Sequence, residues 1–388
     1  MDFTLTPEQD AIRENVERLC ARFDDDYWLD RDDTGEFPAD FHQAMAEAGW
    51  LGIAMPEEYG GAALGVTEAA ILMHTVARSS GAMSAASAIH INIFGPHPIV
   101  VFGTAEQKAR WLPDLIKGKA ISCFGVTEPD AGLNTTRIKT KAERSGNGFV
   151  VNGKKIWTTT AQEAHKIMLL VRTTPLEKCK KPTEGLSLFY TDLDRKYCDV
   201  REIPKMGRKS VDSNEVFIDA LPVPMDDLIG EEGMGFRYLL HSLNPERVLV
   251  GVEGIGIGQN ALARAVRYAK DRVVFDRPIG MNQSIQHPLA EVWCELEAAW
   301  LMAMHAAALY DSGQECGAQA NATKYLGGEL GFKACQQAVM THGGMGYAKE
   351  FHVERLLRES LICRIAPISP QMILNYISER VLGLPRSY

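Results

Sequence analysis

The stretch LNPERVLVGVEGIGIG, from Leu243 to Gly258, indicates a long apolar helix that packs closely on its neighbours. Gly251, Gly254 and Gly258 share one face of such a helix, where the missing Cβ lets another backbone approach. The GIGIG segment resembles a dinucleotide-binding loop, but that fingerprint requires a preceding strand and a helix that starts at the glycines. Because these glycines lie inside the helix, we expect a packing face and not a phosphate-binding loop.

Two charged residues, Glu246 and Arg247, stand near the beginning of this apolar run. We expect Asn244 to cap the helix, Pro245 to take its first position and Glu246 to lie in its first turn. A carboxylate there commonly complements the helix dipole, which stabilises the helix by about 0.3–1 kcal/mol and lowers the pKa of the acid. Desolvation by a bound ligand would raise that pKa instead. The residues alone leave two interpretations of Glu246, a helix-end charge and a catalytic base.

Helical patterns occupy both ends of the chain. Thr6 and Pro7 open a helix, and apolar residues recur three or four positions apart until about residue 117. In the C-terminal part, one apolar stripe that ends at Gly313 comprises Leu289, Val292, Trp293, Leu296, Trp300 and Met304. Several such helices in succession predict an antiparallel bundle.

The middle of the chain has a different pattern, with short runs rich in β-branched and aromatic residues. Asn152-Gly153 stands between two apolar runs, which predicts a tight hairpin at that point. The predicted fold class is therefore α+β. We expect a helical N-terminal domain over 1–119, a β-barrel-like domain over 120–227 and a helical bundle over 228–388.

Composition narrows the class of protein. The chain has 388 residues, of which 46% are apolar and 23% charged, as in globular proteins of two or three units. A net charge of −9 without a Lys/Arg run argues against nucleic acid as a partner. The eight cysteines form no Cys-x-x-Cys pair and the N-terminus has no signal-peptide pattern, so we expect free thiols and a cytoplasmic location. We expect no membrane span, since no run of about 18 uninterrupted apolar residues occurs.

The ten histidines show no metal-ligand spacing, and we expect no metal site. His74, His90 and His97 are interpreted as structural or pocket-lining residues. His342, which stands beside two glycines, is the histidine for which a functional role is most worth testing.

Four further stretches carry a resemblance to a known family: CFGVTEPDAG (Cys123–Gly132), KKIWTTT (Lys154–Thr160), RVVFDRPIGMNQSIQHPLAEV (Arg272–Val292) and MTHGGMGY (Met340–Tyr347). In this order and at these separations the chain resembles an acyl-CoA dehydrogenase over nearly its whole length. The resemblance implies a C-terminal four-helix bundle, FAD bound between the β-domain and the bundle, and an acyl-CoA thioester against the flavin.

The same resemblance implies roles for individual cofactor residues. Phe124, Val126 and Thr127 would form a wall of the flavin site, Trp157 would pack on the ring, and Thr159 would reach its polar edge. Trp157 and Thr159 flank Thr158 in a strand, so we expect them to share a face. The other implied FAD contacts are Arg272 at the pyrophosphate with Phe275 and Gln283, all three from a neighbouring subunit, and Thr158, Met340, Gly343, Gly344, Ser369 and Gln371. The implied assembly is at least a dimer, and we expect a homotetramer.

Removing the α-proton of a thioester requires a base that faces the flavin across the substrate. Many members of the family carry a Glu in a C-terminal YEGTSQ segment, but the matching stretch here is APISPQ, Ala366–Gln371, with Pro367 at the position of the base. The isovaleryl-CoA dehydrogenase subgroup places its Glu within LER on the helix that opens the bundle. This chain has PER there, and the resemblance makes Glu246 the catalytic base.

Contacts to the substrate are implied in the same way. Gly132, Asn244 and Arg247 stand where the family holds the CoA arm, and Leu133 replaces a serine that contacts it. Ala366 occupies the place of a frequent Tyr and would leave room for a branched acyl group. Pro367 has no N–H to hold the thioester oxygen, so either Ile368 supplies that donor or the oxygen is less well held.

The function implied is a flavin-dependent oxidoreductase that converts a short, medium or branched acyl-CoA to a 2-enoyl-CoA and passes electrons to an electron-transfer flavoprotein. Two alternatives stay open. A desulfinase-type relative would use the same site for elimination without net oxidation, and a homologue that has lost FAD would only bind acyl-CoA.

Overall fold

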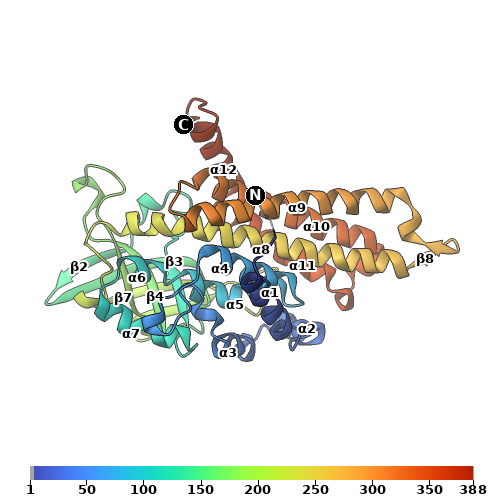
Figure 1. Ribbon diagram of the computed structural model, residues 1–388. Coiled ribbons are helices and arrows are strands. Elements are labelled where there is room, and N and C mark those ends of the chain that lie inside the picture. Colours follow the sequence, from blue (N-terminus) through green and yellow to red (C-terminus); the bar gives the residue numbers. More distant parts are fainter. Residues whose placement is uncertain (1–3, 388) are drawn as a thin grey trace.

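The computed structural model describes residues 4–387 and arranges them as N-terminal helices, a curled central sheet and a C-terminal helical bundle (Figure 1). This is the predicted fold class. The first helix begins as predicted, with the Thr6 hydroxyl accepting from the backbone N–H of Gln9 and Pro7 in the first position. The N-terminal helices are α1 (Pro7–Cys20), α2 (Asp25–Thr34), α3 (Ala39–Glu47), α4 (Val66–Arg78), α5 (Ala82–Phe94), α6 (His97–Phe102) and α7 (Ala105–Ile116).

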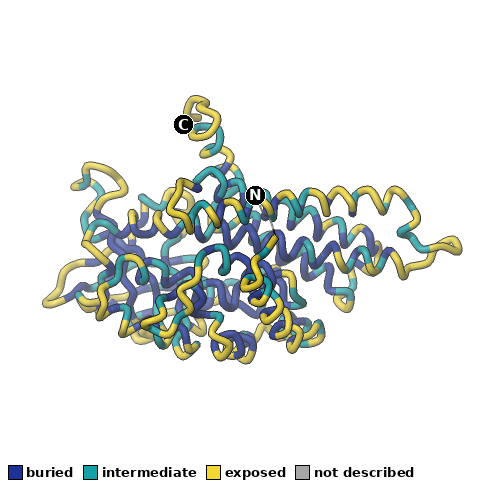
Figure 2. Tube along the Cα trace, in the orientation of Figure 1, coloured by how far each residue is buried: buried dark blue, intermediate teal, exposed yellow. Residues whose placement is uncertain are grey.

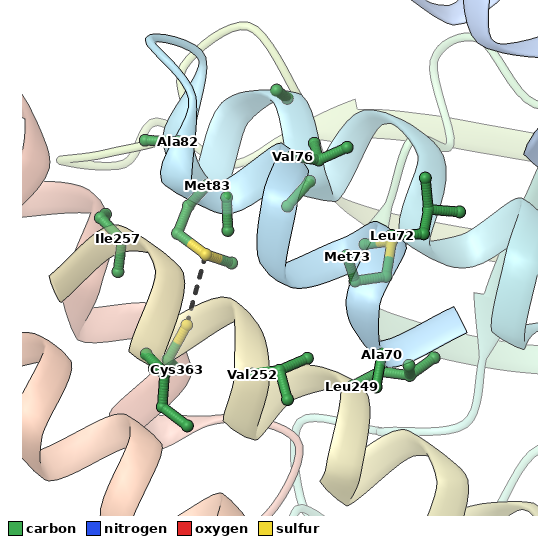
Figure 3. Close-up of a cluster of buried hydrophobic side chains, with 14 of the residues drawn as sticks. Ala70, Leu72, Met73, Val76, Ala82, Met83, Leu249, Val252, Ile257 and Cys363 are labelled. Atoms are coloured by element: carbon green, nitrogen blue, oxygen red, sulfur yellow. Dashed lines mark hydrogen bonds between the residues drawn. The ribbon is translucent and has the colours of Figure 1, made fainter. Parts of the chain in front are cut away.

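Helix α5 is the central helix of the N-terminal region. The segment Ala82–Phe102 is long and apolar enough by composition to cross a membrane, but 72% of its most apolar window is buried inside the fold. Figure 3 shows the reason: residues at the start of α5, such as Met83, pack against side chains of α4 and of the bundle, and the Cys363 thiol lies 3.4 Å from the Met83 sulfur. The apolar character of α5 is therefore that of a core helix.

The central sheet has seven strands in the order β1-β4-β2-β3-β7-β6, with β5 paired to β4. Its strands are β1 (Ser122–Gly125), β2 (Lys141–Ser145), β3 (Gly148–Thr159), β4 (Lys166–Arg172), β5 (Leu186–Asp192), β6 (Cys198–Glu202) and β7 (Ser213–Pro224). The hairpin predicted at Asn152-Gly153 is wrong, because the β2–β3 turn lies at Gly146 and Asn147. Asn152 and Gly153 lie inside β3 at a register irregularity, where the Asn152 side chain accepts from the Ala220 N–H at 2.9 Å.

The bundle is built on α8 (Gly235–Asp271), which begins well before the predicted start. Asn244 therefore does not cap the helix, Pro245 lies inside it, and Glu246 is not in its first turn. The sequence GEEGMGF before Pro245 is loop only as far as Met234. The other bundle elements are the β8–β9 hairpin (Val273–Val274 and Arg277–Pro278), α9 (Gln283–Asp311), α10 (Gly317–His342), α11 (Val353–Ile365) and α12 (Pro370–Tyr376).

The glycines of α8 form a packing face, as predicted. A Cβ on Gly254 would meet the Gly327 carbonyl oxygen at 2.4 Å, and one on Gly251 would meet the Thr323 side chain at 2.6 Å, both on α10. On another side of α8, a Cβ on Gly256 would meet the His74 carbonyl oxygen on α4 at 2.5 Å. Helix α8 is thus held at close range by α10 and α4, which leaves little freedom in the position of its side chains.

One face of α9 differs from the predicted stripe. Leu289, Val292 and Leu296 are buried, but Trp293 is 56% exposed and turns away from the core. The outer side of α9 and the region around α12 are exposed over much of their length (Figure 2). Alanines of α9 that were not part of the predicted stripe, such as Ala299 and Ala303, are fully buried in the core.

Candidate active site

The end of β1 and the middle of β3 form one wall of the candidate site. The Ile156 N–H donates to the Thr127 carbonyl at 2.9 Å and joins the two segments. Behind them, the Lys155 ammonium donates to the Val126 carbonyl at 3.1 Å and to the Glu128 carboxylate at 2.9 Å. Burial lowers the pKa of Lys155 to about 8 although Glu128 opposes that shift. This buried pair fixes the half-buried side chains of Phe124 and Val126 at the surface of the sheet.

Trp157 lies on this wall in an unusual conformation. It has φ +60°, a left-handed region that bulky residues rarely adopt, and it stands at a register irregularity between β3 and β7. Its side chain is 57% exposed, Thr159 is half-buried, and Thr158 between them is buried. Burial therefore alternates along the strand as predicted, with Trp157 and Thr159 more exposed than Thr158. Thr158, which was predicted to contact FAD, is buried, and its hydroxyl has no hydrogen-bond partner among the described residues.

Helix α5 connects this wall to the bundle. The Phe94 ring lies 6.0 Å from the Phe124 ring, and His90 lies one turn earlier with its ring 5.7 Å from that of Phe94. His90 Nδ1 is 2.6 Å from the Glu253 carboxylate of α8, and both residues are buried. Burial would lower the pKa of His90, but Glu253 raises it above its ordinary value. The pair is a buried ionic contact next to the wall.

Glu246 lies on α8 seven residues before Glu253, which places both on one side of the helix. Burial raises the pKa of Glu246 to about 7, while His90 and Arg247 act to lower it and Glu253 to raise it. Across residues 4–387, no side chain or N–H donates a hydrogen bond to its carboxylate. The expectation that the helix dipole lowers this pKa is wrong, since Glu246 is far from the helix end. The rise also occurs without bound substrate, contrary to expectation.

The other residues predicted to bind substrate divide into two groups. On α8, the Arg247 guanidinium donates to the Asn244 side-chain oxygen at 2.9 Å, and its Nε is buried without a partner in the described structure. Gly132 and Leu133 lie in the exposed loop after β1, where Leu133 is 60% exposed.

The segment from Ala366 to Gln371 is held by a buried lysine of α10. Lys324 Nζ donates to the Arg364 carbonyl at 2.8 Å and to the Ile368 carbonyl at 2.7 Å, one on each side of Ala366 and Pro367. Burial lowers the pKa of Lys324 to about 8. The Ile368 N–H donates to no backbone carbonyl or side chain among the described residues. Beyond it, the Ser369 hydroxyl caps α12, and Gln371 is exposed.

A second group of predicted cofactor residues lies at the other end of the bundle, beside the β8–β9 hairpin (Figure 1). Arg272 is exposed at the end of α8, and its guanidinium has no ion pair in the part of the chain described. Phe275 is 94% exposed with φ +51°, and Gln283 is the exposed first residue of α9. These residues do not share a site with Trp157 within one chain.

The end of α10 lies beside the hairpin and completes this second group. Met340 is 69% exposed, and a Cβ on Gly343 or Gly344 would meet nothing within 4 Å. A groove of 490 Å³ runs here, and its lining includes Arg264, Arg267, Tyr268, Arg272 and His342. The His342 ring stacks on the Tyr268 ring at 4.2 Å, and its Nδ1 donates to the Ala338 carbonyl at 2.8 Å, so its role is structural as well as pocket-lining.

Two residues of the site were given no functional role by the sequence. His90 was assigned a structural or pocket-lining part, and Glu253 was passed over. A signal for Glu253 existed, since it is the one carboxylate inside the apolar run from Val248 to Gly258 and follows Glu246 by two helical turns. No sequence pattern indicated that His90 on a distant helix would meet it.

The β-domain wall fits the flavin that the resemblance implies. An exposed indole held at a strained φ offers a flat surface for ring stacking. Strain of this kind concentrates at ligand sites, and the half-buried Thr159 provides a hydroxyl next to the indole. At the other end of the bundle, the unpaired Arg272 and the open space at Gly343 and Gly344 fit a pyrophosphate and a ribose.

Comparison with known proteins agrees with this geometry. Sequence models of the acyl-CoA dehydrogenase N-terminal, middle and C-terminal domains match residues 6–119, 123–221 and 233–382. The acyl-CoA dehydrogenase FadE12 of Mycobacterium tuberculosis is 35% identical over 100% of this chain and 99% of its own length. The butyryl-CoA dehydrogenase structure from Megasphaera elsdenii superposes with a TM-score of 0.93, at 26% identity, over 98% of this chain and 100% of the other. An FAD complex of PigA has a TM-score of 0.93 and 26% identity over 99% and 100% of the two chains. The chain therefore belongs to the acyl-CoA dehydrogenase family of FAD-dependent enzymes.

Proposed function

We propose that this enzyme removes the α-proton and the β-hydride of an acyl-CoA thioester to give a 2-enoyl-CoA, with Glu246 as the base. The observation that carries the proposal is the raised pKa of Glu246, about 7, on a carboxylate with no hydrogen-bond donor among the described residues. A base is most effective when its pKa is near the working pH, because it is then both available and able to accept the proton. A free carboxylate at its ordinary pKa would be too weak a base.

FAD, when bound, supplies the acceptor for the hydride. The chain supplies the rest of the chemistry. Glu246 takes the α-proton, and Asn244 and Arg247, which are already hydrogen-bonded to each other at 2.9 Å, hold the CoA arm beside it. The wall at Trp157 and Phe124 would hold the flavin ring and exclude water from the face of the ring away from the substrate, and Gly132 and Leu133 would flank the CoA arm on the loop after β1.

The thioester oxygen needs a donor that Pro367 does not have. We assign this part to the Ile368 N–H, which has no acceptor among the described residues although its neighbouring carbonyls are fixed by Lys324. Because Lys324 already holds this loop, the Ile368 N–H would not need to move during the reaction, which avoids a free-energy cost of reorganisation. In this proposal the small side chain of Ala366, on the same loop, lies beside the acyl group and leaves room for a short, medium or branched chain. The position of Glu246, which is that of the base in the isovaleryl-CoA dehydrogenase subgroup, agrees with a branched substrate.

The two groups of cofactor residues support an assembly of at least two copies. Strand β3, which carries Trp157, lies in the central sheet, and Arg272 directly precedes β8 at the far end of the bundle (Figure 1). A single FAD would therefore take its ring contacts from one chain and its pyrophosphate contacts from another. Exposed apolar side chains on the hairpin, Val273 at 55% and Phe275 at 94%, favour burial in such a contact. We propose a homotetramer of two dimers in which Arg272, Phe275, Gln283, Met340, Gly343 and Gly344 serve the partner's FAD.

An electron-transfer flavoprotein is the proposed electron acceptor, and the cytoplasm the proposed location, which the eight free cysteines favour. Ser369 and Gln371 are proposed to contact FAD from the loop that follows Pro367. The domain limits at 119/120 and 227/228 stay predictions.

The test is an anaerobic screen of acyl-CoA thioesters for bleaching of the flavin, followed by analysis of the products. A dehydrogenase gives stoichiometric 2-enoyl-CoA and reduced flavin. A desulfinase-type enzyme leaves the flavin oxidised at the end of turnover and releases a small anion. Failure of every saturated acyl-CoA to reduce the flavin would refute the proposed reaction.

A further inference from the structure

The buried contact between His90 and Glu253 lies next to the proposed base, and the reaction as described above does not use it. His90 comes from α5 and Glu253 from α8, with Nδ1 and Oε1 2.6 Å apart. Their side chains are 10% and 3% exposed. A hydrogen bond of this length between an imidazolium and a carboxylate is charge-assisted, and it is stronger than one between neutral groups.

We propose that the His90–Glu253 pair is the positioning device of the base: Glu253 holds His90 as an imidazolium, and that charge keeps Glu246 ionised and aimed across the site. The inference rests on the proposed role of Glu246. His90 and Glu253 are positioning residues here, since neither is argued to touch the substrate.

The geometry supports this arrangement from three sides. Glu246 and Glu253 lie on one side of α8, two turns apart, so the imidazole bound to Glu253 lies on the side of α8 that carries Glu246. His90 Nδ1 is occupied by Glu253, and Nε2 has no hydrogen-bond partner among residues 4–387, which leaves that N–H free. The Phe94 and Phe124 rings connect His90 to the β-domain wall through successive ring contacts.

Within residues 4–387, the charged groups around the pair come from α8, α5, α11 and the loop before β7. On α8 they are Glu246, Arg247 and Glu253, and on α5 only His90. Arg208, in the loop before β7, is buried near Glu253 and donates to the Ser87 hydroxyl of α5 at 2.9 Å. The buried Glu359 of α11, which accepts from the Ser84 hydroxyl of α5 at 2.7 Å, acts more strongly on Arg208 than Glu253 does. The imidazolium is therefore the cation that acts most strongly on Glu246. This agrees with the lowering action of His90 on the pKa of Glu246.

The experiment compares His90→Gln, Glu253→Gln, the double variant and a control in the FAD-loaded enzyme. Gln at position 90 keeps a donor toward Glu253 but carries no charge. The control is His74→Gln, because His74 is also buried next to α8 but bonds the neutral Gln259 at 2.8 Å. The measured quantity is the pH midpoint of single-turnover flavin reduction by saturating 3-methylbutanoyl-CoA, or by butanoyl-CoA if that reacts faster.

The expected results differ in sign between the two partners. His90→Gln removes the cation and leaves Glu253 to repel Glu246, so the midpoint should rise by about one pH unit or more. Glu253→Gln removes an anion and, by loss of its partner, also the charge of His90, so the midpoint should move by less than half of that. The double variant should resemble Glu253→Gln, and His74→Gln should resemble the wild type. Equal midpoints in His90→Gln and wild type would overturn the proposal and make the pair a structural contact.

A second readout does not depend on turnover. Glu246→Gln changes the melting temperature in a pH-dependent way, and the midpoint of that difference reports the pKa of Glu246. The midpoint measured in a His90→Gln background should lie higher than in the wild-type background. If Glu246→Gln reduces flavin normally, the proposed base is wrong, yet this readout still tests the coupling of His90 to Glu246. An unshifted midpoint of the melting difference would refute the coupling between His90 and Glu246. If His90→Gln or Glu253→Gln does not fold, the same midpoint is measured in the variant that does fold.

Discussion

The N-terminal third of α8 (the buried end) and its C-terminus (the exposed end) carry the two charged groups of the proposed site, and they are built in opposite ways. At the buried end, Glu246 is half-buried, and burial raises its pKa to about 7. At the far end, Arg272 is exposed next to a hairpin whose Phe275 is 94% exposed. One group is tuned by its own chain, whereas the other has no partner within the described residues.

The difference suggests that this fold separates the reactive group from the cofactor-binding group. A raised pKa of Glu246 requires an environment of low polarity. One chain can form this environment alone, because α4, α5 and α10 pack closely around α8. Binding of an anionic cofactor requires an accessible cation, and exposure keeps Arg272 charged and available. We therefore expect changes at the buried end to alter rate and pH dependence, and changes at the exposed end to alter cofactor retention and assembly.

The largest expected effect is at the buried end. Glu246→Gln keeps the size of the side chain but removes the proton acceptor, and loss of a general base costs about 10²–10⁴-fold in rate. Single-turnover flavin reduction with saturating acyl-CoA should fall by at least about a hundredfold, with acyl-CoA affinity retained. Glu163→Gln, on an exposed turn of the β-domain, serves as the control. Wild-type reduction in Glu246→Gln would mean that the carboxylate is only structural.

The next effect is at the exposed end. Arg272→Ala removes a proposed charge-assisted contact to the pyrophosphate, which is worth about 1.5–3 kcal/mol, so FAD should bind about 10–100-fold more weakly. The matched control is Arg277→Ala on the same hairpin, where the guanidinium is already bonded to Asn282 at 2.8 Å. Equilibrium dialysis of flavin and native mass measurement are the readouts. A monomer that retains FAD would contradict the division of the cofactor site between two chains.

A smaller effect concerns the pocket beside the base. Ala366→Tyr fills the space next to the acyl group, and overpacking costs about 1–3 kcal/mol. The kcat/KM for branched thioesters should fall about 5–100-fold while that for straight short chains changes less, and Ala366→Gly should preserve both. Equal losses for branched and straight substrates would show that position 366 does not select by shape.

The fold was predictable because its strongest signals are local. The period of the apolar residues, the Thr6-Pro7 cap and the glycine face of α8 all act within a few residues of chain, and the structure confirms them. The hairpin prediction failed because two nearby sequences, Gly146-Asn147 and Asn152-Gly153, are both typical of tight turns. The turn forms at Gly146-Asn147, and Asn152-Gly153 lies within β3 at a register irregularity. Trp293 was misplaced because alanines, which a hydrophobic stripe undervalues, form the tight face of α9.

The candidate site was predictable only in part. The resemblance supplied Glu246, Trp157 and Arg272, but the start of α8 was wrong because Pro245 was read as an N-terminal signal. Tertiary packing carries the helix through that proline from Gly235 to Asp271. The environment of Glu246 depends on His90, 156 positions earlier in the chain (246 − 90), and such non-local contacts leave no mark in periodicity.

The smallest expected effect separates burial from catalysis at the buried end of α8. The pKa of Glu246 is raised in the folded protein from 4.5 to about 7, so the folded state binds more protons than the unfolded state between those pH values. Stability contributed at this site is therefore fully present below about pH 4.5 and is lost as the pH rises through about 7. Glu246→Gln removes that penalty and should be more stable than the wild type at pH 8, by up to about 3 kcal/mol at about 1.4 kcal/mol per pKa unit, once screening by solvent at this half-buried side chain is included. The advantage should vanish at pH 4.5, as followed by melting of both FAD-loaded proteins without substrate. A variant that is less stable than the wild type at pH 8 would show that Glu246 is ionised without penalty, and the contrast between the two ends of α8 would then be one of position and not of electrostatics.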